Sequence, residues 1–127
     1  MFYGLWEQVS ELRNKMEMRI ADIASDAIFI GKDVERLPNT SNFSVPGWKG
    51  ETQVMNMDLA GFAISAGSAC SSGKVKSSQA LNAMGYDDIT ASSAVRISLG
   101  PSTTEHEVMN FVDAWSKAYK KYAVKTA

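Results

Sequence analysis

The chain has 127 residues, the size of one domain, and it is 45% hydrophobic and 21% charged, as is usual for folded proteins. Its net charge of −1 gives no reason to expect binding to nucleic acid or to an anionic membrane. No apolar run approaches the roughly 20 residues of a membrane span, and the N-terminus lacks the layout of a secretion signal. From the length we expect a single domain, residues 1–127. One cysteine cannot form an internal disulfide, which agrees with a reducing compartment, and we expect the cytoplasm.

The first part of the chain predicts a long helix and two short strands. Apolar residues recur at steps of three and four over about residues 5–24, which is typical of an amphipathic helix. Residues 27–30 form a short apolar run, and residues 40–45 include alternating polar and apolar side chains, so each predicts a strand. Pro46 and Gly47 then indicate a turn.

The middle of the chain predicts two more helices and a third strand. Residues 51–60 favour a helix, with Gly61 placed to end it. Residues 62–64 read as a short strand, and a further short helix is expected from Ser77 or Ser78 to Gly85.

The last part predicts a strand over residues 94–99 and a long C-terminal helix. Thr104 and Glu107 have the spacing of a capping box at the start of that helix. Its apolar face would contain Val108, Val112, Trp115, Tyr119 and Tyr122. Two long helices around short strands predict a two-layer α/β (α+β) fold, with the helices on one face of a small sheet.

Cys70 is the main candidate for chemistry. It lies within residues 65–73, which are glycine, serine and alanine apart from the cysteine itself. Such a segment has little apolar surface with which to pack, so we expect an accessible thiol on a mobile loop. The alternative is a free surface cysteine without a role. Lys74 and Lys76 could lower the thiol pKa or could simply solvate the loop, and we favour solvation.

Arg96 is the second candidate, because it interrupts an apolar strand. Alternation places it with Ala94 and Ser98, opposite Val95 and Ile97. Its guanidinium would suit a substrate carboxylate; the plainer reading is an exposed arginine on a strand.

Other polar residues give weaker signals. One histidine and one distant cysteine provide no metal-site spacing, and His106 is a poor candidate for general acid or base. Side chains near the motif segments that could line a site, or equally serve turns and loops, are Asn39, Thr40, Asn42, Ser65 and Ser68.

Over about residues 12–122 the chain resembles the C-terminal domain of cysteine desulfurases, pyridoxal phosphate (PLP) enzymes of the class V aminotransferase-like family. The resemblance rests on the Gly-Ser-Ala-Cys loop at residues 67–70, on Arg-Ile-Ser-Leu-Gly at residues 96–100 and on the order of the segments around them. The Ser-Ala-Gly-Ser-Ala-Cys form is similar to the class with a long, mobile catalytic loop. The resemblance implies the small domain of a fold-type I enzyme.

The resemblance also implies roles for the two candidates. Cys70 would receive sulfur from L-cysteine as a persulfide and pass it to a sulfur-acceptor or scaffold protein, for iron–sulfur cluster assembly or another sulfur-transfer pathway. Arg96 would bind the substrate carboxylate. The parent enzyme would be a homodimer.

The family's PLP lysine and its surrounding segments have no match here. We therefore expect the large PLP-binding domain to be absent, and this chain alone to bind no PLP and to be inactive. Two alternatives remain open: a stand-alone sulfur-carrier or interaction module, and part of a related selenocysteine lyase.

Overall fold

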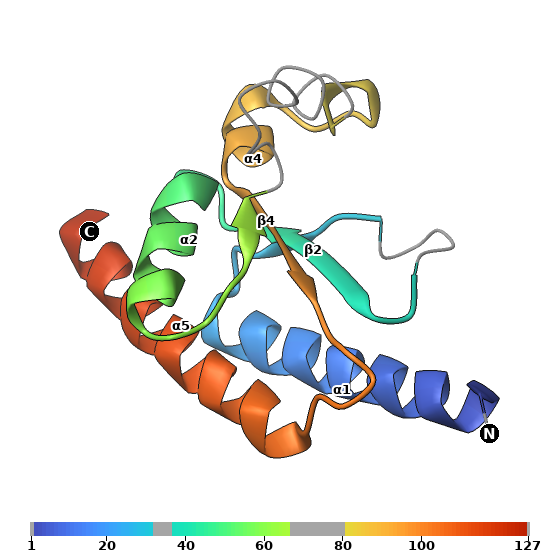
Figure 1. Cartoon of the computed structure of the whole chain (residues 1–127). Coiled ribbons are helices and arrows are strands. Elements are labelled where there is room, and N and C mark those ends of the chain that lie inside the picture. The colour runs from blue at the N-terminus through green and yellow to red at the C-terminus, as the bar shows by residue number, and fades with distance from the viewer. Residues whose placement is uncertain (1, 32–36, 67–80, 127) are drawn as a thin grey trace.

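The structure, a computed structural model, describes residues 2–31, 37–66 and 81–126 (Figure 1). In the described ranges, two 22-residue helices near the two ends of the chain bracket short strands, two shorter helices and the last turn of a further helix at residues 81–83. The elements are α1 (Phe2–Ile23), β1 (Ile28–Phe29), β2 (Thr40–Ser44), α2 (Gly50–Leu59), β3 (Ser65–Ala66), α4 (Asp88–Ser92), β4 (Ala94–Ser98) and α5 (Glu105–Thr126).

The four strands form one antiparallel sheet in the order β1-β2-β4-β3. The two longer strands, β2 and β4, lie at its centre, with Phe43 opposite Val95. Because direct cross-strand partners share a face, this register places the apolar residues of both strands on the same side of the sheet.

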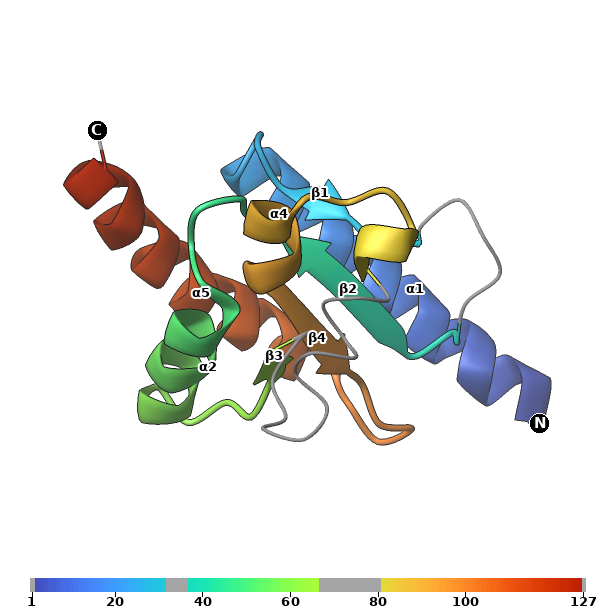
Figure 2. The same cartoon turned by 90° about the horizontal axis from the view of Figure 1, so that it is seen from above.

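The long helices α1 and α5, together with α2, cover that apolar side (Figures 1 and 2). The core between the layers contains an aromatic cluster in which Trp115 contacts Phe43 edge-on and stacks with Tyr119. Trp48 lies beside Trp115 and stacks with Tyr122. The predicted two-layer α/β fold is therefore confirmed.

Most of the predicted elements are present. The helices expected over residues 5–24 and 51–60 and the strands expected over residues 27–30, 40–45 and 94–99 all form, within a few residues of their expected ends. The capping box is also confirmed: Glu107 Oε1 accepts a hydrogen bond from Thr104 N, and Thr104 Oγ1 accepts one from Glu107 N.

The prediction of a strand over residues 62–64 is wrong. The strand β3 begins only at Ser65, because Ser65 and Ala66 are the residues that pair with β4. Phe62 instead packs its ring edge-on against Phe111 of α5 at 5.6 Å. Its apolar character reflects this packing on a helix, not membership of the sheet.

The helix α4 was not expected. Its N-cap is Asp87, whose carboxylate accepts a hydrogen bond from Thr90 N at 2.8 Å; this bond lowers the pKa of Asp87. The helix expected to end at Gly85 does end there, with φ of +99° at that glycine, but its predicted start at Ser77 or Ser78 lies outside the described residues.

Within the described ranges, no helix is both long and apolar enough to cross a membrane.

Candidate functional site

The face of the sheet opposite the long helices has a row of polar residues at its centre. Arg96 of β4 lies directly between Asn42 of β2 and Ser65 of β3 in the strand register. Direct partners in antiparallel strands have Cα atoms about 4.5–5.5 Å apart and share a face. Three strands from separate parts of the sequence therefore bring these three side chains together.

The alternation predicted for β4 is confirmed from Val95 to Ser98, whereas Ala94, predicted on the face of Arg96, is buried. Arg96 and Ser98 are exposed, whereas Val95 and Ile97 are buried against the helices. Thr40 pairs with Ser98, and so extends the polar face by one further row. This face is polar because every second residue of the two central strands points away from the core.

The guanidinium of Arg96 makes no hydrogen bond or ion pair to any residue in the part of the chain that the structure describes. A planar guanidinium offers donors in a fixed fork, which matches the two oxygens of a carboxylate. The hydroxyl and amide groups beside it provide further donors and acceptors. The row can therefore bind a small carboxylate such as that of an amino acid.

Asn39 has a different place from the other polar candidates. The side-chain Nδ2 of Asn39 donates to Leu99 O at 3.1 Å, and the backbone carbonyl of Asn39 accepts a hydrogen bond from Leu99 N. Asn39 therefore fixes the end of β4 beside β2. Of the polar candidates near the motif segments, Thr40, Asn42 and Ser65 share the face of Arg96.

Cys70, Ser68, Lys74 and Lys76 lie outside the described residues. The predicted role of Cys70 therefore stays a prediction. The last described residue before that segment is Ala66, which pairs with Val95 at the edge of the sheet.

The described residues do not fit a PLP site of the Schiff-base type. The lysines among them belong to α1 and α5 or directly precede α2, and none lies in a strand beside Arg96. No group of three or more histidine, cysteine or acidic side chains in the described ranges could hold a metal ion. His106 is exposed in the first turn of α5.

The structure also has a groove between α2 and α5, on the helical side of the sheet, which the sequence reasoning missed. Lysines on α5 line it at positions 117, 121 and 125. Their four-residue spacing, which places them on one face of a helix, was the signal that could have revealed it.

Comparison with known proteins identifies the family. The family model for aminotransferase class-V matches residues 3–111. The chain belongs to the aminotransferase class-V family. The residues that match the family model include β1 to β4, and therefore the row of Arg96 with Asn42 and Ser65.

Among the curated relatives of this class-V chain are cysteine desulfurases. It is 37% identical over 101 residues to "Cysteine desulfurase NifS" of Azotobacter vinelandii, covering 80% of this chain and 25% of that protein. It is 32% identical over 115 residues to "Cysteine desulfurase IscS" of Dictyoglomus turgidum, covering 91% of this chain and 29% of the relative. The chain thus spans between a quarter and a third of the length of these relatives.

Solved structures share the fold of this class-V chain. The NifS-like protein from Rickettsia africae superposes with a TM-score of 0.78 at 23% identity, and the match covers 91% of this chain and 29% of that one. A second NifS-like protein gives a TM-score of 0.75 at 27% identity, with coverage of 91% and 28%. These likenesses agree with an α/β part of a fold-type I enzyme.

Proposed function

We propose that this chain is the C-terminal domain of a PLP-dependent cysteine desulfurase. In it, Arg96 binds the carboxylate of L-cysteine. The Cys70 thiolate forms an S–S bond to the substrate sulfur while the C–S bond of L-cysteine breaks, which leaves a persulfide on Cys70 and, once the carbon is protonated, alanine. The observation that carries the proposal is the row of Arg96 with Asn42 and Ser65: an exposed guanidinium without a described partner, among polar side chains.

The connection to Cys70 supports the pairing of these two roles. Cys70 follows Ser65 by five residues, and Ser65 is the direct partner of Arg96 in the sheet. Five residues span at most about 18 Å, so the covalent chain keeps the thiol in the neighbourhood of the arginine. A thiolate can accept sulfur as a persulfide, whereas the neighbouring serine hydroxyls cannot.

The cofactor belongs to another part of the enzyme in this proposal. No described lysine lies in a strand beside Arg96, which supports placing PLP on a domain outside this chain. Alone, the chain would neither bind PLP stoichiometrically nor release sulfide from L-cysteine. The proposed enzyme is a cytoplasmic homodimer that delivers sulfur to an acceptor or scaffold protein for iron–sulfur cluster assembly.

A chimeric enzyme tests the proposal. This chain replaces the matching quarter of the Azotobacter vinelandii relative, and PLP absorbance first establishes that the chimera is folded and loaded. We expect cysteine desulfurase activity in the chimera and none in Cys70→Ala. We expect Arg96→Ala to raise the KM for L-cysteine, because losing a charge-assisted carboxylate contact costs about 2–5 kcal/mol.

Ser92→Ala is the matched control for these variants, since Ser92 is exposed on α4 and its hydroxyl bonds only the preceding turn. It should keep the activity of the unmodified chimera. Sulfide release is measured with dithiothreitol present, which reduces the persulfide. The proposal is overturned if PLP-loaded Cys70→Ala and Arg96→Ala chimeras release alanine and sulfide as well as the unmodified chimera does.

A further inference from the structure

The groove between α2 and α5 has a volume of about 1090 Å³ and an apolar floor with a cationic rim. Trp48 and Met57 are buried in its floor, and Ala114, Ala118 and Tyr122 of α5 are half-buried beside them. Leu59, at the end of α2, is 83% exposed at the rim. The groove is therefore lined by apolar groups that no described segment covers.

The charge of the groove differs from that of the whole chain. Four lysines line it, at positions 49, 117, 121 and 125, against one acid, Asp113. All four are exposed, and none forms an ion pair with a residue that the structure describes. A chain of net charge −1 thus concentrates a net positive charge, four lysines against one aspartate, along one side of an apolar groove.

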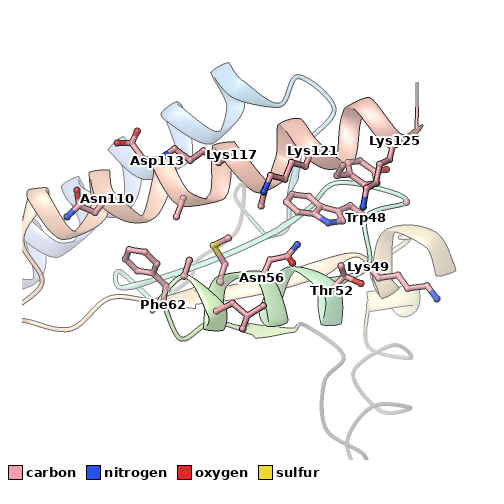
Figure 3. Close-up of a pocket in the computed structure, with 17 residues that line it drawn as sticks. Trp48, Lys49, Thr52, Asn56, Phe62, Asn110, Asp113, Lys117, Lys121 and Lys125 are labelled. Atoms are coloured by element: carbon pink, nitrogen blue, oxygen red, sulfur yellow. The ribbon is translucent and has the colours of Figure 1, made fainter.

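The lysines of α5 form a regular row. Lys117, Lys121 and Lys125 are four residues apart, so their Cα atoms advance about 6 Å along the helix at each step. Figure 3 shows Lys121 and Lys125 beside Trp48, whereas the carboxylate of Asp113 points away from α2. Carboxylates on a neighbouring helix, also spaced at four residues, would match this row.

A helical occupant fits better than an extended one. The groove is bounded by two helices, so it presents no strand edge with which an extended peptide could pair its backbone. A helix pairs its backbone hydrogen-bonding groups internally, and it can present an apolar face and an acidic face to the groove. The lining from Asn110 to Lys125 is about 22 Å long, enough for a helix of roughly 15 residues.

We propose that this groove is a docking site for an acidic amphipathic helix of a partner protein. The apolar face of the helix packs on the floor around Trp48 and Ala118, and glutamates at four-residue spacing pair with Lys117, Lys121 and Lys125. The site lies on the helical side of the sheet, opposite Arg96, and it depends neither on Cys70 nor on the proposed desulfurase activity.

The test uses a fluorescein-labelled helical peptide of about 15 residues, with leucine and alanine on one face and glutamate at every fourth position. The matched control peptide has glutamine in place of glutamate. Fluorescence anisotropy with the 127-residue chain should show binding that weakens with added salt, because exposed charge pairs are screened. Amide NMR shifts should move at Ala114 and Ala118 and stay unchanged at Ser98.

Charge reversal on α5 provides the decisive comparison. We expect the double variant K117E/K121E to weaken binding about tenfold or more, since two attractive pairs become repulsive. K120E is the control: it makes the same Lys-to-Glu change on the same helix, but Lys120 does not line the groove. It should weaken binding less than about twofold. Circular dichroism and the melting temperature check that each variant is folded.

A charge-swap rescue completes the test. A peptide with lysine in place of glutamate should bind K117E/K121E better than it binds the unmodified chain. The proposal is overturned if the glutamine peptide binds equally well, or if K120E and K117E/K121E weaken binding alike. It is also overturned if only single-stranded DNA, anionic vesicles or a second copy of the chain binds through these lysines.

Discussion

Trp115 Nε1 donates a 3.0 Å hydrogen bond to Gln53 Oε1 in the middle of the core, where both side chains are completely buried. Gln53 Nε2 in turn donates to Trp48 O at 3.0 Å. One amide thus links α2, α5 and the turn after β2. Because the groove has Trp48 in its floor, this buried bridge also fixes the shape of the proposed docking site.

Gln53→Leu should lower the free energy of unfolding by about 1–3 kcal/mol or more, because it leaves the indole N–H of Trp115 buried without a partner. Urea denaturation measures the change. Gln8→Leu is the control, since Gln8 is exposed on α1, and it should change stability by no more than about 0.5 kcal/mol. Equal effects of the two substitutions would contradict the structural role of the bridge.

Gly50→Ala should destabilise the fold by about 1–3 kcal/mol. A Cβ atom at this position would lie 2.4 Å from Ala94 O and 3.3 Å from the Cβ of Ala66, so α2 would have to move away from β4. Gly4→Ala provides the comparison, because an added Cβ there meets nothing within 4 Å. Thermal unfolding should show a lower Tm for Gly50→Ala only; an unchanged Tm would contradict the close approach.

The sequence predicts the elements whose signals are local. Periodicity of apolar residues indicates the long helices, and the spacing of Thr104 and Glu107 indicates where the last one begins. The strand at Ser65 and Ala66 was misplaced because its position depends on pairing with β4, a contact between distant parts of the chain. Asp87, three residues before Thr90, was a local signal for α4 that went unused.

In the candidate site, too, local features could be predicted from the sequence, whereas contacts between distant parts of the chain could not. Alternation along β4 predicts that Arg96 is exposed and on the polar face. That Asn42 and Ser65 are its neighbours follows only from the strand order β2-β4-β3, which no local pattern specifies. The docking groove needs the packing of α2 on α5, and for the same reason it is visible only in the structure.

Arg96→Ala should leave the free energy of unfolding within about 0.5 kcal/mol of its original value, because the guanidinium has no described partner to lose. Val95→Ala, one residue earlier and completely buried, should cost about 2 kcal/mol through lost burial and the resulting cavity. Urea denaturation compares them. If both variants were equally destabilised, Arg96 would have a structural role, contrary to the binding role proposed for it.

The ion pair between α1 and α5 predicts a pH effect. Lys15 Nζ lies 2.6 Å from Glu105 Oε1; this hydrogen bond lowers the pKa of Glu105 and raises that of Lys15. The Glu105 contribution to stability is present above its unfolded pKa and is lost as the pH falls through the lower folded value. The Lys15 contribution is lost as the pH rises through its raised folded pKa.

Lys15→Met should therefore move the pKa of Glu105 upward, as measured by carboxyl carbon NMR across an acid titration. The depressed pKa of Asp87 should stay in place in the same variant, because its cause is the hydrogen bond from Thr90 N. A Glu105 titration curve that Lys15→Met leaves unchanged would show that the ion pair does not form in solution.

Cys70 should react with Ellman's reagent in the folded chain at a rate near that of the urea-unfolded chain. The glycines, serines and alanines from Ser65 to Gly73 offer little apolar surface with which to shield a thiol, and the single cysteine makes the reading unambiguous. The pH dependence of the rate gives the thiol pKa. If Lys74 and Lys76 only solvate the segment, replacing both by methionine leaves that pKa unchanged, whereas a rise would mean that they stabilise the thiolate. Slow labelling of the folded chain would contradict the accessibility on which the proposed sulfur transfer depends.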